Sequence, residues 1–237
     1  MSVARTARAR VHEEVSAEIL AVARTHLARD GAAGLSLRSV ARDLGLAPSA
    51  LYRYYPGRDA LLSALILSAY GSLADEAERA SAAAYAATGG DAERWLAVPR
   101  AMRHWALEHP HEWSLIFGTP VPGYEAPPDT VVPYARLAAA LLRPVLDAKA
   151  EGRQQLAGTP PALSETLRAA VAPVAEAFPG LPEAQVVLAL QAWTTLIGAI
   201  SLELFGHWRN TVLAPEEFYE DTIRRMAATI GLDRVLE

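Results

Sequence analysis

The sequence contains no cysteine, so it offers no disulfide, no thiolate nucleophile and no thiolate zinc site. It also lacks the glycine-rich fingerprints of phosphate-loop and dinucleotide-binding proteins, and the G-x-S-x-G turn of serine hydrolases. No pattern indicates a catalytic site. We therefore predict that the protein is not an enzyme and needs no cofactor.

Membrane and export signals are missing as well. The polar, arginine-rich start, MSVARTARARVHEE, is not followed by the apolar core of a secretory signal. No run of about 18 uninterrupted apolar residues occurs, so the sequence predicts no membrane span. The expected location is the cytoplasm.

Helix-forming residues dominate what is present. Hydrophobic residues make up 51% of the chain and charged residues 21%, which is enough for a folded core. Alanine is abundant and no strand alternation emerges, so the predicted fold class is all-α. Helices are expected over 12–29, 37–44, 48–55, 58–87, 91–109, 110–117, 130–151, 161–178, 183–207 and 215–230.

Positive charge gathers at the N-terminus. Residues 1–60 carry nine arginines against six acidic residues, a net charge of +3, within a chain whose total is −5. A basic N-terminal segment on an acidic remainder indicates contact with a polyanion. Arg5, Arg8 and Arg10 precede the first expected helix, where they would form either an arm that reaches a minor groove or a disordered tail.

Residues 36–55 have the pattern of two short helices joined by a tight turn. Ser36 suits the N-cap of the first helix, and Gly45 suits the left-handed residue that closes it. Pro48 suits the first position of the second helix. Leu51 and Tyr55 are four residues apart and would face inward. This pattern predicts a helix-turn-helix, whose second helix is too short to be stable without a scaffold.

The stretch LSLRSVARDLGLAPSALYRYYPGRDALL resembles the DNA-binding segment of the tetracycline repressor (TetR/AcrR) family. The residues that carry the match are Ser36, Val40, Ala41, Gly45, Leu46, Leu51, Tyr52, Tyr55 and Leu61. The rest of the chain matches mainly in layout, although EHPHEWSLIF and WTTLIGAISLELFG resemble segments of ligand domains in some members.

The resemblance implies roles for particular residues. Tyr52 and Tyr54 resemble the aromatics that anchor the DNA backbone, and Arg58 resembles a cation that binds phosphate. The sequence departs from the pattern at Tyr54, where histidine is frequent, and at Ala47, which replaces the capping serine or threonine. Ser49 and Arg53 are the best candidates for base contacts, and Arg38 could contact either phosphate or base. The predicted DNA-binding residues are Arg38, Ala47, Pro48, Ser49, Tyr52, Arg53, Tyr54 and Arg58.

We expect a DNA-binding domain over 1–57 and a ligand-binding and dimerisation domain over 58–237, with 58–87 as the connecting helix. Segment 183–207 is apolar nearly all round, so it must be buried on every side. With 215–230 it would form a four-helix bundle between two subunits, which palindromic operator DNA requires. The alternative is burial inside one subunit.

Aromatic residues in the C-terminal part suggest a cavity for a small, largely apolar effector, although most such residues taken singly are more often ordinary core. The candidates are Trp105, Trp113, Phe117, Tyr134 and Trp193. The predicted function is therefore a ligand-responsive homodimeric repressor of operator DNA. The alternatives are a regulator that responds to a protein partner, and a helical carrier of an apolar molecule that no longer binds DNA.

Four residues near the middle of the chain raise the possibility of a metal site: His104, Glu108, His109 and His111. They lack the H-E-x-x-H spacing, and Pro110 interrupts the helix between the last two histidines. We interpret them as helix-end residues and predict no metal.

Overall fold

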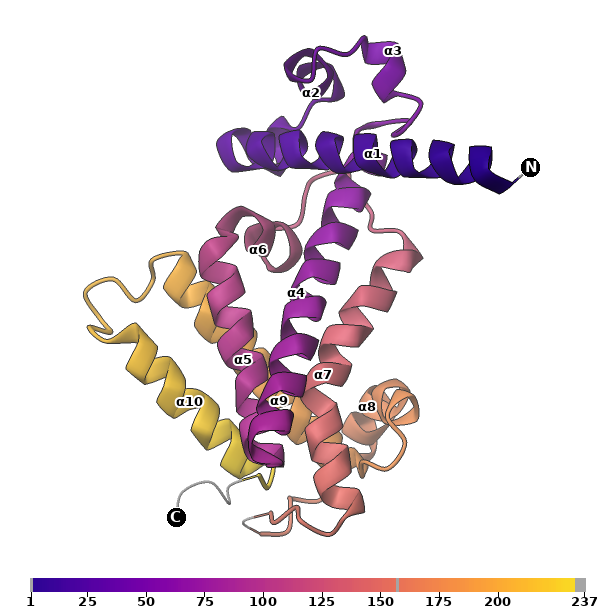
Figure 1. Ribbon diagram of the computed structural model, residues 1–237. Helices are drawn as coiled ribbons and strands as arrows, with labels where there is room; N and C mark the ends of the chain where they lie inside the picture. The colour runs from indigo at the N-terminus through magenta and orange to yellow at the C-terminus, as the bar shows by residue number, and fades with distance from the viewer. Residues whose placement is uncertain (1, 157, 233–237) are drawn as a thin grey trace. The chain divides into compact units, whose positions relative to one another are not determined.

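The computed structural model describes residues 2–156 and 158–232 (Figure 1). Within these ranges the chain is helical and has no strand, which confirms the all-α prediction. The α-helices are α1 (Ser2–Asp30), α2 (Leu37–Asp43), α3 (Pro48–Leu51), α4 (Arg58–Thr88), α5 (Asp91–Glu108), α6 (Pro110–Phe117), α7 (Val131–Ala150), α8 (Glu165–Ala177), α9 (Glu183–Leu204) and α10 (Pro215–Thr229). Short 3₁₀ helices cover Ala32–Gly34 and Pro128–Thr130.

The first helix is longer than predicted. α1 begins at Ser2 instead of near residue 12, so the segment with Arg5, Arg8 and Arg10 is helical. The expectation of a disordered tail is therefore wrong, and contact of this segment with a minor groove stays a prediction. The reason is local, because alanine, arginine and glutamate favour helix and no glycine or proline interrupts the chain before Gly31.

The chain divides into two compact units. The first, which we call the head, consists of the residues up to Ser72 together with His109–Pro133. The second, which we call the body, consists of Leu73–Glu108 and the residues from Tyr134 onward. The head therefore contains all of the expected DNA-binding segment 1–57, and also the beginning of α4 and the whole of α6.

The head is held by one apolar core and one polar cluster. Ile19 of α1, Leu51 of α3 and Leu65 of α4 are fully buried in the core. In the polar cluster, Arg24 of α1 donates from Nε to Oε1 of Glu112 at 2.9 Å and from Nη2 to Ser68 Oγ at 2.6 Å. Glu112 lies on α6 and is buried, so this cluster ties α6 to α1 and α4.

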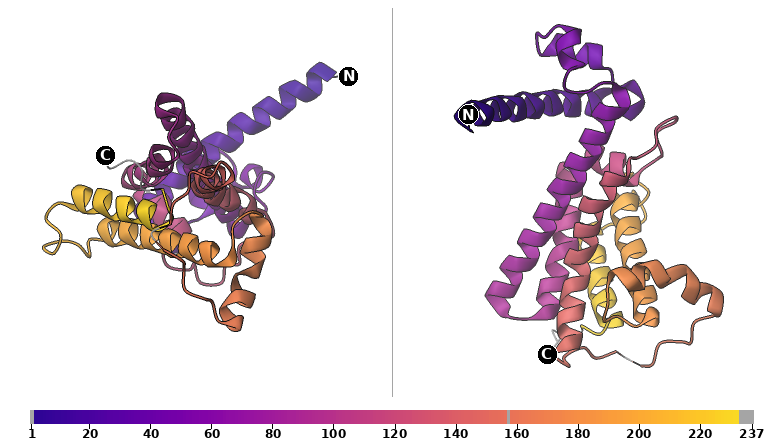
Figure 2. Two further views of the ribbon diagram at one scale, coloured as in Figure 1. Left: turned by 90° about the horizontal axis from the view of Figure 1, so that it is seen from below. Right: turned by 90° about the vertical axis from the view of Figure 1, so that its right-hand side faces the viewer.

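The body is a bundle in which α5 packs against both α9 and α10. The left view of Figure 2 shows α9 and α10 side by side, running in opposite directions. Arg103 of α5 makes a two-bond contact with Glu203 of α9, at 2.7 and 2.8 Å. Tyr219 of α10 is buried and donates to the Pro99 carbonyl at 3.0 Å, and this burial raises the pKa of its phenol. Long helices are thus joined by charge-assisted bonds as well as by apolar packing.

One helix in the described ranges, α9, is long and apolar enough by length and composition to cross a membrane. In the structure this helix packs against α5, α8 and α10. Only 28% of its most apolar window is buried within the single chain. The remaining apolar surface of α9 must therefore be accounted for.

Candidate nucleic-acid interface

Helix α2 begins and ends as its sequence predicts. The Ser36 side chain accepts from the Ser39 amide, although the bond is long at 3.5 Å. At the other end Gly45 has φ of +67°. The Gly45 amide donates to the Arg42 carbonyl at 3.0 Å, and the Leu46 amide donates to the Ala41 carbonyl at 2.8 Å. These two bonds form a Schellman motif, which favours glycine because a Cβ is disfavoured at positive φ.

The turn delivers the chain into α3, which has only four residues. Pro48 occupies its first position, as predicted, and Ala47 makes no side-chain cap. The Tyr52 amide donates a hydrogen bond to the Pro48 carbonyl, and the Tyr54 amide donates one to the Leu51 carbonyl. These bonds continue the helical turn past the end of α3. Leu51 is fully buried and Tyr55 is half-buried against the same core, so the inward face is confirmed.

The outward face of this unit is polar and cationic. Six of the predicted DNA-binding residues are exposed: Arg38, Ala47, Pro48, Ser49, Tyr52 and Arg53. The Tyr52 side chain, for example, is 44% exposed. Hydroxyl and guanidinium groups on a projecting helical turn are the groups that contact phosphates and base edges in a major groove.

The other two predicted residues, Tyr54 and Arg58, are partly engaged within the head. The Tyr54 ring is half-buried and lies 4.7 Å from the His12 ring. Arg58 donates from Nη2 to the Ala32 carbonyl at 2.8 Å, and its Nη1 lies 3.6 Å from Asp59. A guanidinium has five N–H donors, so Arg58 retains donors for a phosphate.

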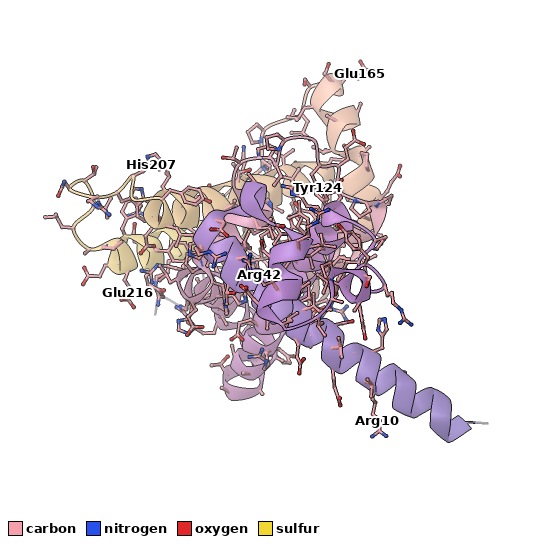
Figure 3. All side chains as sticks on the ribbon, turned by 90° about the horizontal axis from the view of Figure 1, so that it is seen from above. Arg10, Arg42, Tyr124, Glu165, His207 and Glu216 are labelled. Carbon is pink, nitrogen blue, oxygen red and sulfur yellow. The ribbon has the colours of Figure 1, made fainter. Side chains whose placement is uncertain are left out.

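Arg42 is a candidate that the sequence pattern did not single out. Its side chain is 74% exposed, and it lies one helical turn after Arg38 on α2. The spacing of four residues was the available signal, because it places both guanidinium groups on one face. Figure 3 labels Arg42 over the head, and also Arg10, which lies on the part of α1 that extends away from α2 and α3.

Comparison with known proteins decides what this unit is. Residues 19–65 match the model for bacterial regulatory proteins of the tetR family, and residues 95–226 match the model for the tetracyclin repressor-like C-terminal domain. The chain belongs to the TetR family. It is therefore a DNA-binding transcriptional regulator with a helix-turn-helix, and not an enzyme.

Full-length relatives agree with this TetR-family membership. The HTH-type transcriptional regulators Mb1846 of Mycobacterium bovis and Rv1816 of Mycobacterium tuberculosis are each 35% identical over 223 residues, covering 92% of this chain and 93% of the relative. A crystal structure of SCO4313, described as a regulatory protein, is 34% identical, with a TM-score of 0.72 over 92% of this chain and 97% of the other. The TetR-family regulator PfmR of Thermus thermophilus is 16% identical and shares the fold, with a TM-score of 0.52 over 92% of this chain and 98% of the other.

TetR-family regulators usually respond to small molecules, so the placement of the five predicted ligand residues matters. Trp113 and Phe117 belong to the head, where their rings are 4.5 Å apart. Tyr134 and Trp193 belong to the body and meet edge to face at 5.6 Å. Trp105 is buried in α5. A ring contact thus lies in each unit, and the ligand role of all five residues stays a prediction.

Trp193 does line a cavity, and its aromatic neighbour there is Trp95. The cavity lies between α7 and α9, with Leu141 and Val145 among its walls, and its described lining has no charged side chain. Its volume is about 20 Å³. Since one water needs roughly 10–15 Å³, the cavity is closed to anything larger in this conformation.

The histidine-rich segment of this TetR-family protein is organised by ion pairs. His104 lies 3.4 Å from Glu108 on the exposed end of α5, and His109 lies 3.2 Å from Glu112. Among the residues that the structure describes, no three histidine, aspartate or glutamate side chains are placed to share a metal ion.

Proposed function

We propose that this TetR-family regulator is a homodimeric cytoplasmic repressor, released from operator DNA by a small, neutral and largely apolar effector. The observation that carries the proposal is the apolar surface that α9 and α10 expose. Leu190 and Leu202 on α9 are 37% and 43% exposed, and Phe218 on α10 is 47% exposed. Large exposed apolar side chains on two helices that pack together favour burial against another protein surface.

A second copy of the chain is the partner that fits this surface. Two antiparallel helices from each subunit make a four-helix bundle through a two-fold, self-complementary contact. Such a dimer presents two heads, which match the two half-sites of a palindrome. The predicted interface is thus 183–207 with 215–230, and the predicted DNA contacts are Arg38, Ala47, Pro48, Ser49, Tyr52, Arg53, Tyr54 and Arg58.

The effector proposal rests on the cavity between Trp95 and Trp193. An apolar wall without charge favours a neutral ligand, and Gln154 and Gln185 supply the polar groups that could orient it. Because the cavity is closed, a ligand must shift the body toward a more open conformation, and it releases DNA only if it binds that conformation better. Trp105, Trp113, Phe117 and Tyr134 remain proposed contributors to the effector response.

Sedimentation and DNA-binding measurements test the dimer. We expect the wild type to sediment as a dimer and to bind a selected palindrome as two chains per duplex. Leu202→Arg buries a charge at the interface, so it should yield monomers with at least a 100-fold loss of operator affinity, about 2.7 kcal/mol. Leu167→Arg is the matched control, because Leu167 is 40% exposed but lies on α8. A dimeric Leu202→Arg variant with normal DNA affinity would refute the proposed interface.

The effector is tested by screening neutral apolar compounds for a rise in unfolding temperature, and then for release of bound DNA. Trp193→Ala should weaken any active compound by about tenfold or more, since a buried aromatic contact is removed. Tyr85→Ala is the control, because Tyr85 is an exposed aromatic residue of α4 and does not line the cavity. Compounds that act equally on both variants would place the effector elsewhere.

A further inference from the structure

A histidine lies inside the head at a position where apolar packing alone would not require one. His26 is on α1, beside the buried Ala23 and Leu27, and is only 1% exposed. Burying a polar ring costs free energy unless its nitrogens are hydrogen-bonded. The partners of this ring therefore indicate what the histidine does.

Both ring nitrogens have partners. Nε2 lies 2.7 Å from Oδ2 of Asp43, and Nδ1 lies 3.4 Å from Nη2 of Arg29. A carboxylate accepts hydrogen bonds and a guanidinium only donates them. The arrangement thus places the proton on Nε2 and leaves Nδ1 as the acceptor. Arg29 in turn donates to both carboxylate oxygens of Asp30, at 2.9 and 2.8 Å.

Asp43 occupies a sensitive place in the helix-turn-helix. It is the last residue of α2 and comes two residues before Gly45, where the chain turns. A carboxylate at the C-terminal end of a helix meets the negative end of the helix dipole, which is unfavourable. The hydrogen bond from His26 offsets this cost and holds the pKa of Asp43 below its ordinary value. The nearby guanidinium of Arg42 is farther away, with its Nε 3.5 Å from Oδ1.

Helix α3 has little of its own to set its direction. It has four residues, and its N-terminal side lacks a side-chain cap. The orientation of α3 is therefore set by the packing of Leu51 in the core and by the turn that follows α2. Any change in where α2 ends would be passed on to Ser49, Tyr52 and Arg53.

We propose that His26 is a positioning residue for DNA recognition: through Asp43 it fixes the end of α2, and hence the direction in which the turn presents α3. His26 is buried and does not touch DNA. Its effect should appear in the discrimination between DNA sequences, because the exposed arginines that attract any duplex stay in place when His26 is changed.

The test uses two duplex probes and full-length protein. One is the duplex that the wild type enriches from a random pool, and the other is a scrambled duplex of the same length. His26→Leu keeps an apolar side chain but removes the Nε2 donor. We expect it to bind the enriched duplex about tenfold more weakly while its affinity for the scrambled duplex changes less than about twofold.

Conservative variants separate positioning from simple stabilisation. His26→Gln carries an amide donor that can reach Asp43, so it should restore most of the lost discrimination. Asp43→Ala removes both the acceptor and a negative charge, so it should raise both affinities but lower their ratio by a similar factor to His26→Leu. Combining His26→Leu with Asp43→Ala should cause little further loss, because both changes remove the same contact. Glu18→Gln, an acid-to-amide change at an exposed site on α1, should leave the ratio unchanged.

Circular dichroism and urea unfolding establish that each variant is folded at the assay temperature. If folded His26→Leu kept the wild-type ratio of affinities, His26 would only stabilise the head and the proposal would be wrong. If His26→Leu did not fold, Asp43→Ala decides, because the Asp43 side chain is 37% exposed and alanine favours helix. An unchanged ratio in Asp43→Ala would overturn the proposal on its own.

Discussion

Helices α3 and α9 are opposites in what they expose. α3 has four residues and presents hydroxyl and guanidinium groups around a small apolar anchor, Leu51. α9 has 22 residues and presents leucines. The folding of one chain explains neither surface. In α3 only Leu51 is buried, and in α9 much of the apolar area is exposed. The comparison teaches that the chemistry a helix leaves exposed indicates its partner, which is a polyanion for α3 and, in the proposed dimer, a protein surface for α9.

The two helices are also held in different ways. α3 depends on its neighbours, through the turn after α2 and the packing of Leu51. α9 is tied to α5 by the Arg103–Glu203 contact, whose side chains are 16% and 12% exposed. Changes to the contacts that hold α9 within its own chain should therefore act mainly on stability, and changes near α3 mainly on recognition.

The largest expected effect comes from breaking the ion pair under α9. Glu203→Leu leaves the Arg103 guanidinium buried without its carboxylate, so the free energy of unfolding should fall by about 3–5 kcal/mol. Urea unfolding measures this. Adding Arg103→Met should recover much of the loss, because it removes the unpaired charge.

The control for that experiment is Asp221→Asn, which breaks the exposed pair with Arg225. Those side chains are 58% and 74% exposed, so the change should cost less than about 1 kcal/mol. A Glu203→Leu variant as stable as this control would mean that the buried pair does not hold α9.

A smaller effect, confined to recognition, is expected at Arg53. Arg53→Ala should cost about 1–3 kcal/mol of binding free energy on the selected duplex and relax the preference at particular base pairs. Binding to a panel of single-base variants measures this, with the urea midpoint as the folding control. Equal weakening on every duplex would show that Arg53 contacts only the backbone.

Arg58 should behave differently from Arg53. Arg58→Ala should weaken binding on all duplexes and reduce the slope of log affinity against log salt by about one unit, because one phosphate contact is lost. It should also lower stability slightly, since the bond to the Ala32 carbonyl is removed. A stability change with an unaltered salt slope would make Arg58 a purely structural residue.

At the cap of α2 the expected effect is smaller again. Ser36→Ala should lower the free energy of unfolding by about 0.5 kcal/mol, the low end for an N-cap, because the observed bond is long. Thermal unfolding detects this change, with Ser36→Asp as the control that keeps a capping oxygen. No change relative to the wild type would mean that the cap is not formed in solution.

The smallest effects are expected in acid. The pKa of Glu220 lies below its ordinary 4.5 chiefly because Arg100 donates hydrogen bonds to it, and that of Asp43 lies below 3.8 chiefly because of His26. A lowered pKa in the folded protein means stability that is present above the ordinary value and lost as pH falls through the folded one. Glu220→Gln and Asp43→Asn should therefore each flatten the decline in stability below pH 4.5 and 3.8 respectively. Urea midpoints between about pH 7 and pH 3 test this, and a slope identical to the wild type would contradict it.

Local features were the most predictable part of the fold. The N-cap at Ser36, the left-handed Gly45 and the first-position Pro48 are all as the sequence predicts. These features depend on the conformational preferences of a few adjacent residues, so a short stretch specifies them. The expected start of α1 near residue 12 is wrong, because alanine and arginine before that position favour helix as well as carrying positive charge.

Contacts between distant segments were not predictable in the same way. Nothing local shows that Glu112 meets Arg24, or that Arg58 binds the Ala32 carbonyl. Of the five aromatic residues predicted to bind the effector, Trp193 lines the described cavity, and the role of the others stays a prediction. The number of aromatic residues suggested a cavity, but the packing of the helices determines which residues line it.

By itself, the amino-acid sequence determined that this protein is helical, where its DNA-reading helices begin and end, and which family it belongs to. These follow from periodicity and from residues that act within a turn of their own position. Only the tertiary structure decided that α6 belongs with the head, that His26 reaches Asp43, and that the cavity beside Trp193 is closed. The physical reason is that such contacts join side chains far apart in the chain, and their geometry exists only after the whole core has packed.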